Sequence, residues 1–305
     1  MAMNNNFSFH TLWQKLLPLY EAREAQAIMR MVLEYRFGFS LTDIACGEVE
    51  RLTEAQQKEL ISDISRLKNN EPVQYVLGNA WFCDRSFHVE PGVLIPRPET
   101  EQLCRIIIKD YTNNNHIHSS ILNSNTILDI GTGSGCIAIT LALGIPNAKV
   151  NAIDISSNAL RIAKANAERL GANVNFRIGN ALSLLPLSEE NKDVERTSEG
   201  GGETVIVSNP PYITESERQD MSKNVLEHEP ELALFVPDND PLLFYRSIGR
   251  YAAKSLANNG CLYLEINPRF AKELKAMLFE LGFSNVEIIN DDFDKQRFIK
   301  ASFVE

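Results

Sequence analysis

Four consecutive residues, Asn209-Pro210-Pro211-Tyr212, combine side chains that suit the methylation of a planar nitrogen. The lone pair of an amide or aromatic amine is delocalised, so a site for this reaction must hold the N–H groups and fix the plane of the acceptor. Asn209 supplies a neutral oxygen acceptor, and Pro210 has no N–H, so its carbonyl can face a cavity. Pro211 restricts Pro210 to extended backbone, and Tyr212 supplies a flat ring. Asn-Pro and Pro-Pro are also common turn dipeptides, so this interpretation depends on a cofactor site upstream.

A nucleoside-binding pattern does lie upstream. The apolar strand predicted over 126–130 leads into a glycine-rich loop, which is followed by an apolar helix predicted over 136–143. Glycines permit a tight turn and a close approach of backbone to ligand. A second strand, 148–153, ends at Asp154, which lies 154 − 131 = 23 positions after the first glycine of the loop, near the spacing of a ribose-binding acid. The predicted cofactor-binding residues here are Asp129, Gly131, Thr132, Gly133, Ser134, Gly135 and Asp154.

The loop differs from the common phosphate-binding patterns. Position 136 is Cys where the dinucleotide fingerprint requires Gly, and no Walker lysine follows. A glycine loop without a phosphate grip, combined with a ribose-binding acid, suits S-adenosylmethionine. A third strand is predicted over 174–178, and Asn180 follows it. We also assign Asn209 to the predicted cofactor-binding residues.

The chain resembles the HemK/PrmC family of protein-(glutamine-N5) methyltransferases over about residues 10 to 303. One matching stretch is 72–78, which leads to Phe82 and Phe87. A second is Ile-Pro-Arg-Pro-Glu-Thr-Glu over 95–101, and the third joins the glycine loop to Asn-Pro-Pro-Tyr-Ile. Asn-Pro-Pro-Tyr alone occurs in many amino-methyltransferases of DNA, RNA and protein, whereas the second stretch is far more specific. The resemblance implies that Asn180 contacts adenine, although the family more often has Asp at this position.

The resemblance implies a substrate and a set of roles. The substrate is the glutamine of the Gly-Gly-Gln motif in class-1 peptide chain release factors, and the cofactor product is S-adenosylhomocysteine. Asn209 Oδ1 and the Pro210 carbonyl are expected to accept the two amide hydrogens, with Tyr212 against the amide plane. Pro211 and Arg97 complete the predicted substrate site, although Arg97 is equally explained as a solvated linker charge.

The predicted fold class is α/β, with three parts. Residues 1–75 read as a small helical bundle, in which Thr53 and Gln56 have capping-box spacing. We interpret this bundle as a substrate-recognition domain, the alternative being a plain scaffold. Residues 76–97 are predicted to form a β-hairpin linker, and 98–305 a Rossmann-like, seven-stranded class I methyltransferase domain. Glu265 ends a predicted strand, where we favour cavity lining or a hydrogen bond to a loop over a catalytic role.

Composition restricts the partners. The formal net charge is −10, and no Lys/Arg cluster appears, which disfavours nucleic acid. The segment 188–203 contributes six acids against two bases, and we expect a loop there. No apolar run approaches membrane-spanning length, and the N-terminus lacks a signal peptide, so we expect a cytoplasmic protein that binds no membrane. Five scattered cysteines predict reduced thiols, and His116 and His118 lack metal-ligand partners, so no metal is expected.

Three other functions remain open from the sequence. A glutamine methyltransferase of a ribosomal protein would use the same chemistry with a different recognition domain. An adenine amino-methyltransferase of DNA or RNA would use the same four residues, but the absence of a basic patch counts against it. The third alternative is a non-catalytic cofactor-binding scaffold. The complete set of site residues counts against it, because such a protein would not need them.

Overall fold

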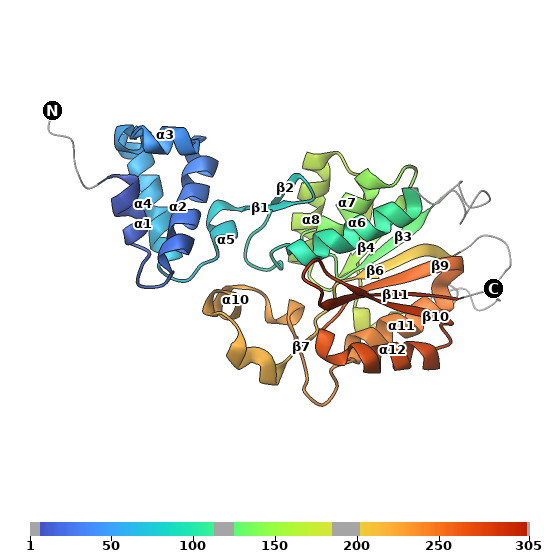
Figure 1. Cartoon of the computed structure of the whole chain (residues 1–305). Helices are drawn as coiled ribbons and strands as arrows, with labels where there is room; N and C mark the ends of the chain where they lie inside the picture. Colours follow the sequence, from blue (N-terminus) through green and yellow to red (C-terminus); the bar gives the residue numbers. More distant parts are fainter. Residues whose placement is uncertain (1–6, 113–124, 185–201, 304–305) are drawn as a thin grey trace. The chain divides into compact units, whose positions relative to one another are not determined.

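The computed structural model describes residues 7–112, 125–184 and 202–303 (Figure 1). The chain forms two compact units. The first runs to Asn79 and includes the later segment Met221–Glu229, and the second comprises Ala80–Asp220 and the chain from Pro230 onward. The segment 221–229 therefore leaves the second unit and returns to it. The predicted domain boundaries at residues 75 and 97, and the roles assigned to the three parts, stay predictions.

The first unit is helical and has its own apolar core. Buried side chains of its two long helices, among them Met29, Leu33, Leu60 and Leu67, pack together. Thr53 and Gln56 form the expected capping box at the start of α4. The elements are α1 (Phe9–Gln14), α2 (Ala22–Phe37), α3 (Leu41–Ala45), η1 (Glu48–Arg51), α4 (Glu54–Leu67), α5 (Val73–Leu77) and α10 (Lys223–His228).

Two arginines hold the short helix α5 in this unit. Arg36 forms an ion pair with buried Asp63 at 2.8 Å and donates to the Val76 carbonyl at 2.9 Å. Arg66 donates to the same carbonyl at 2.9 Å and to the Tyr75 carbonyl at 3.0 Å. Cations near the last carbonyls of a helix stabilise its C-terminal end.

The second unit is built on the predicted seven-stranded sheet, whose strand order is β10-β11-β9-β6-β3-β4-β5. The five strands from β9 to β5 are parallel, and β11 runs antiparallel to β9 and β10. The strands are β3 (Thr126–Ile130), β4 (Lys149–Asp154), β5 (Val174–Ile178), β6 (Glu203–Ser208), β9 (Leu256–Glu265), β10 (Asn285–Asn290) and β11 (Gln296–Ser302).

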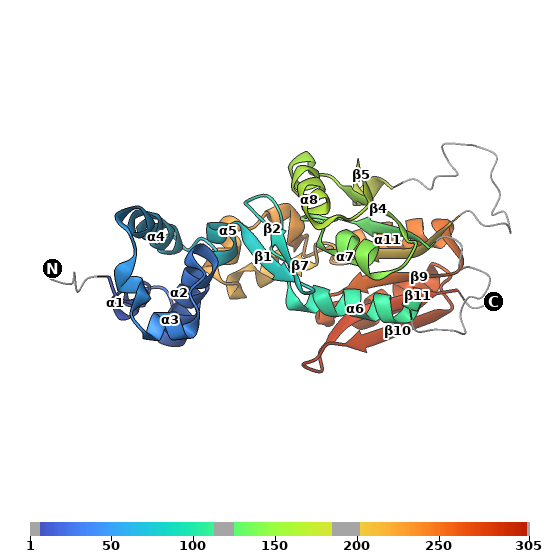
Figure 2. The ribbon, with the colours of Figure 1, turned by 90° about the horizontal axis from the view of Figure 1, so that it is seen from above.

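Helices cover both faces of this sheet (Figures 1 and 2). Because strand side chains alternate, Val205 and Val207 of β6 join the core under one helical layer and Ile206 joins the other core. One layer is α6 (Pro98–Thr112), α7 (Cys136–Gly144) and α8 (Ser157–Leu170), and the other is α11 (Leu243–Ser255) and α12 (Ala271–Glu280). The predicted hairpin is β1 (Asn79–Phe82) and β2 (Arg85–His88).

Several smaller elements were not predicted. Between the Asn-Pro-Pro-Tyr motif and α11 the chain forms β7 (Ile213–Thr214), η3 (Glu215–Asp220), η4 (Glu231–Ala233) and β8 (Phe235–Val236), and elsewhere η2 (Ala181–Ser183). A short helical turn, η5 (Pro268–Phe270), leads into α12.

One predicted boundary is wrong. Glu203, assigned to the acidic insert, begins β6 and is buried, and its carboxylate accepts a 2.8 Å hydrogen bond from the Tyr251 hydroxyl. Residues 188–201 of that insert lie outside the described residues, as do His116 and His118. Within the part of the chain that is described, no helix is long and apolar enough to cross a membrane.

Candidate active site

The predicted site residues gather at one edge of the sheet. The carboxyl ends of parallel strands lie at the same edge, and open α/β sheets bind ligands there, at the point where the strand order reverses. Here the order reverses between β3 and β6. The glycine loop follows β3, Asn209 follows β6, Asp154 ends β4 and Asn180 follows β5. The structure therefore brings the cofactor motif and the Asn-Pro-Pro-Tyr motif to neighbouring strand ends.

The glycine loop has a backbone that favours glycine at three positions. Gly131, Gly133 and Gly135 have φ of +78°, +55° and +83°. A Cβ at Gly131 or Gly133 would meet no atom within 4 Å, so both glycines border open space. A Cβ at Gly135 would lie 3.1 Å from Ala163 Cβ in α8, so this glycine serves packing. The first two glycines therefore leave room for a ligand.

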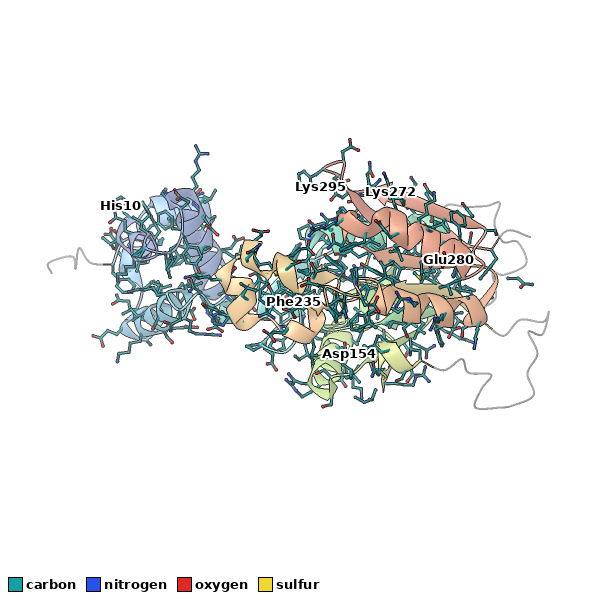
Figure 3. The ribbon with its side chains drawn as sticks, turned by 90° about the horizontal axis from the view of Figure 1, so that it is seen from below. His10, Asp154, Phe235, Lys272, Glu280 and Lys295 are labelled. Atoms are coloured by element: carbon teal, nitrogen blue, oxygen red, sulfur yellow. The ribbon has the colours of Figure 1, made fainter. Side chains whose placement is uncertain are left out.

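Asp154, labelled in Figure 3, ends β4 and holds the glycine loop by hydrogen bonds. Its Oδ2 accepts the Gly133 N–H at 2.9 Å and its Oδ1 accepts the Ser156 N–H at 2.9 Å. The Ile153 carbonyl accepts the N–H groups of Gly131 and Thr132 at 2.9 and 3.0 Å. The predicted ribose-binding carboxylate is thus held against the glycine loop.

Asp129 lies beneath the loop and is fully buried. Its Oδ2 accepts the Thr132 hydroxyl at 2.6 Å and the Ala138 N–H at 3.2 Å, so it connects the loop to the first turn of α7. Its Oδ1 has no hydrogen-bond partner among the described residues. Burial raises the pKa of the Asp129 carboxyl to about 7, against the two hydrogen bonds that lower it.

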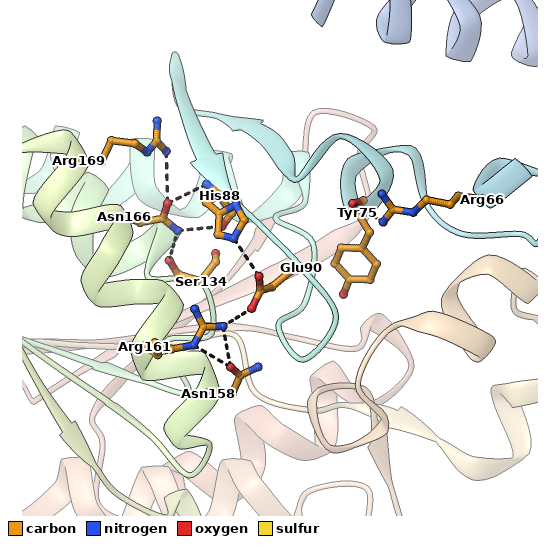
Figure 4. A network of polar contacts seen from close by, with 9 residues as sticks. All are labelled: Arg66, Tyr75, His88, Glu90, Ser134, Asn158, Arg161, Asn166 and Arg169. Carbon is orange, nitrogen blue, oxygen red and sulfur yellow. Dashed lines mark hydrogen bonds and ion pairs between the residues drawn. The ribbon is translucent and has the colours of Figure 1, made fainter. Parts of the chain in front are cut away.

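Asn166 of α8 connects the same loop to the hairpin (Figure 4). Its Oδ1 accepts the His88 N–H at 2.7 Å, and its Nδ2 donates to the His88 carbonyl and to the Ser134 carbonyl, both at 2.9 Å. Beside it, Glu90 accepts from His88 Nε2 at 3.1 Å and pairs with Arg161. A fully buried amide that satisfies three backbone groups makes the loop part of a rigid scaffold.

The Asn-Pro-Pro-Tyr motif is held by both neighbouring strands. The Ser208 hydroxyl, immediately before it, donates to the Ile130 carbonyl, immediately before the glycine loop, at 2.6 Å. The Asn209 Nδ2 donates to Thr100 Oγ1 at 3.1 Å, and the Thr100 hydroxyl donates to Glu265 Oε2 at 2.7 Å. The Asn-Pro-Pro-Tyr motif and the glycine loop are therefore fixed relative to each other by a hydrogen bond between the residues that immediately precede them.

Glu265 also holds the last residue of the motif. The Tyr212 hydroxyl donates to Glu265 Oε1 at 3.0 Å, and Asn267 Nδ2 donates to the Tyr212 carbonyl at 3.1 Å. Burial raises the pKa of Glu265, although its bonds from Thr100 and Tyr212 lower it. Burial likewise raises the pKa of the Tyr212 hydroxyl well above its usual value. The side chain of Glu265 makes the loop hydrogen bond that the sequence favoured.

The remaining predicted positions lie in the same unit. Asn180 is exposed, and its Oδ1 accepts the Leu182 N–H at 2.9 Å as the cap of η2. Arg97 is half-buried just before α6, and its carbonyl accepts the Glu101 N–H at 3.3 Å. Their ligand contacts stay predictions, as do those of Pro210 and Pro211. No group of three or more metal-ligating side chains occurs within 7–112, 125–184 and 202–303.

Sequence reasoning missed Thr100 as a partner of Asn209. The only signal was its place inside the Ile-Pro-Arg-Pro-Glu-Thr-Glu stretch, a specific motif in which Arg97 alone was predicted to have a role. Ser208 and Asn166 were missed as well, because a serine at a strand end and an asparagine in a helix carry no distinctive spacing.

Comparison with known proteins decides the family. The family described as PrmC N-terminal domain matches residues 13–78, and that described as Methyltransferase domain matches 121–240. The chain is 42% identical over 289 residues to the release factor glutamine methyltransferase of Bacteroides thetaiotaomicron, covering 95% of this chain and 96% of the relative. The chain belongs to the release factor glutamine methyltransferase family. A second relative of that name, from Flavobacterium psychrophilum, is 39% identical over 95% of this chain and 96% of its own length.

Solved structures agree on the fold of this release factor glutamine methyltransferase family member. The crystal structure of the hMettl16 catalytic domain in complex with MAT2A 3'UTR hairpin 6 aligns with a TM-score of 0.52 at 13% identity, over 83% of each chain. The predicted class I methyltransferase fold is confirmed by the strand order and by this likeness.

Proposed function

We propose that this protein transfers a methyl group from S-adenosylmethionine to the side-chain amide nitrogen of the glutamine in the Gly-Gly-Gln motif of class-1 peptide chain release factors. The observation that carries the proposal is the hydrogen bond from Ser208 to the Ile130 carbonyl, which fixes an Asn-Pro-Pro-Tyr motif beside a glycine-rich loop. Relatives at 42% and 39% identity that carry this activity in their names support the substrate.

The residues at the strand ends fit S-adenosylmethionine. Gly131 and Gly133 border open space, so ligand atoms can approach the loop backbone. Asp154, already oriented by two backbone N–H groups, has lone pairs left for ribose hydroxyls, and Asn180 is exposed where adenine is expected. When bound, the cofactor supplies an electrophilic methyl group on its sulfonium.

The acceptor amide is held by this chain's own groups. Asn209 Oδ1 and the Pro210 carbonyl would accept the two N–H hydrogens, which keeps the nitrogen in place and excludes water. The Tyr212 ring, anchored through its hydroxyl, would cover the amide plane. Orientation at a contact of about 3–3.5 Å would supply most of the rate gain. No strong base is required, because the nitrogen becomes acidic as it gains the methyl and releases one proton to solvent.

Charge argues for a protein substrate. The net charge of −10 disfavours DNA or RNA, whose binding depends on basic groups. The proposed compartment is the cytoplasm, where release factors act.

Methyl transfer from labelled S-adenosylmethionine to release factor, ribosomal protein and adenine-containing DNA, offered in parallel, tests this proposal. Label on the release factor alone is expected. Label on the ribosomal protein or on DNA, with none on the release factor, would contradict the proposed substrate. A purified protein that binds the cofactor and labels none of the three would contradict the proposed activity.

A further inference from the structure

A buried chain of hydrogen bonds connects the end of β9 to the acceptor motif. Glu265 Oε2 accepts the Thr100 hydroxyl at 2.7 Å, and Thr100 Oγ1 accepts Asn209 Nδ2 at 3.1 Å. Glu265 Oε1 accepts the Tyr212 hydroxyl at 3.0 Å. Glu265 is 1% exposed and Thr100 is 3% exposed, so water does not compete for either group.

Glu265 sets the donor-to-acceptor direction of these hydrogen bonds. Both oxygens of Glu265 act as acceptors, so the single proton of the Thr100 hydroxyl is committed to Glu265. The Thr100 oxygen then presents only lone pairs to Asn209. The amide nitrogen of Asn209 can donate to those lone pairs, whereas its oxygen would be repelled by them.

We propose that Thr100 and Glu265 are positioning residues that fix the polarity of the Asn209 amide, so that Oδ1 rather than Nδ2 faces the methyl acceptor. The inference rests on the proposed function, in which Asn209 Oδ1 accepts an N–H of the substrate amide. It adds two residues to the acceptor site that touch neither the substrate nor the cofactor and act through Asn209.

The polarity matters because the two ends of an asparagine amide are nearly identical in shape. A reversed Asn209 would turn its own N–H groups toward the N–H groups of the substrate, so that two donors meet and no acceptor is offered. The same carboxylate holds the Tyr212 hydroxyl, so one buried group orients both the acceptor of the clamp and the ring beside it. Asn209 itself is only half-buried, and its orientation therefore depends on these partners.

Substitution of Thr100 separates this role from simple packing. Thr100→Val keeps the shape and removes the hydroxyl, while the matched Thr100→Ser keeps the hydroxyl. We expect Thr100→Val to lower kcat/KM for release factor about ten- to hundred-fold, as the loss of a buried hydrogen-bond partner would. The dissociation constant for S-adenosylmethionine should stay within about twofold of the wild-type value. Thr100→Ser should retain most of the wild-type kcat/KM.

Substitution of Glu265 tests the direction of the chain. Glu265→Gln preserves shape but offers an N–H donor to Thr100, whose proton is then free to turn toward Asn209 and favour the reversed amide. We expect a loss of activity comparable to that of Thr100→Val. Because both changes act through one chain, the loss in the double variant should be smaller than the product of the two single losses.

A measurement without substrate keeps this inference separate from the proposed function. The side-chain NH₂ signals of Asn209 can be assigned by nitrogen-15 NMR from their loss in Asn209→Ala. They should exchange with solvent slowly in the wild type and in Thr100→Ser, and faster in Thr100→Val and Glu265→Gln.

The outcomes are distinguishable. Wild-type protein that does not methylate release factor would overturn the proposed function, while protected Asn209 signals would still support the hydrogen-bond chain. Wild-type activity that Thr100→Val leaves unchanged, single losses that multiply in the double variant, or unchanged Asn209 exchange in both variants would overturn the inference. A parallel loss of cofactor binding in Thr100→Val would also overturn it, by assigning Thr100 a purely structural role.

Discussion

At the scale of single residues, the carboxyl of Asp129 is an unusual feature of the proposed cofactor site. It is fully buried, and it holds the glycine loop through Thr132 and Ala138. Its pKa is raised from 3.8 to about 7 by burial, so its ionised form is disfavoured in the folded protein. Between these two pH values the folded state binds more protons at this group than the unfolded state does.

This difference predicts how stability depends on pH. A raised folded-state pKa means that the contribution of Asp129 to the free energy of unfolding falls as pH rises from about 4 to about 7, by about 4 kcal/mol in total. Asp129→Asn cannot ionise, so we expect its destabilisation relative to wild type to be smaller at pH 8 than at pH 5. Urea unfolding of both proteins at the two pH values measures this, and a pH-independent difference would contradict the raised pKa.

Residue types alone identify part of the site. Asn209 and Asp154 were predictable because each directly follows an apolar strand, where side-chain chemistry by itself suggests a role. Thr100 was not, because its partner Asn209 lies 109 residues away and only the fold of the sheet brings α6 beside β6. The position of Glu265 at a strand end suggested a role for it. Its two hydroxyl partners, Thr100 and Tyr212, could not be derived from sequence spacing.

At the scale of elements, the loop between β3 and α7 combines two demands on its glycines. Gly131 and Gly133 have positive φ and border open space, whereas Gly135 has positive φ and packs closely against α8. The two kinds of position should respond differently to an added methyl group.

Gly135→Ala should destabilise the protein more than a glycine change that meets only backbone strain. Its Cβ would lie 2.9 Å from Ile139 Cδ1 and 3.3 Å from Ala163 Cα, which is overpacking against backbone. We expect a loss of about 2–4 kcal/mol in the free energy of unfolding, from overpacking and strain together. The control is Gly171→Ala at the end of α8, where φ is +70° and no atom lies within 4 Å, with an expected loss of about 1 kcal/mol from strain alone. Equal losses in urea unfolding would contradict the packing role of Gly135.

The elements that the sequence predicted well are those with strong local signals. β3 and β5 were predicted over their observed spans, and β4 within one residue at each end, because each is a short strand bounded by turn residues. Ser156 caps α8 and Asn267 caps η5, in keeping with the preference of Ser and Asn for the N-cap position. The segment from β7 to β8 was not predicted, because elements of two to six residues are too short to show a period.

At the scale of the whole molecule, the excursion 221–229 shows a limit of sequence-based domain division. Helix α10 belongs to the first compact unit. There Asn70 Nδ2 donates to Glu227 Oε2 at 3.3 Å, and His228 Nε2 lies 3.0 Å from the Asn69 carbonyl oxygen. A division by consecutive residues cannot assign this segment to the helical unit, because nothing local in its sequence says which core it joins.

The thiols give a test of the burial pattern across the chain. All five cysteines are free, and Cys46 is exposed while Cys83, Cys104 and Cys136 are buried. Burial raises the pKa of Cys136 to about 12 and that of Cys104 well above its usual value. We expect a disulfide reagent to modify Cys46 rapidly in the native protein and all five thiols only after unfolding. A fast reaction that persists in Cys46→Ser would contradict this pattern.

The central claim is that Asn209 clamps a release factor glutamine beside the cofactor. The most direct test is tandem mass spectrometry of release factor after incubation with S-adenosylmethionine and either wild-type protein, Asn209→Ala or the exposed control Asn285→Ala. We expect one methyl group on the glutamine of the Gly-Gly-Gln motif with the wild type and the control. With Asn209→Ala we expect none, although this variant still binds the cofactor. Methylation at another residue, or undiminished methylation of the glutamine by Asn209→Ala, would contradict the account.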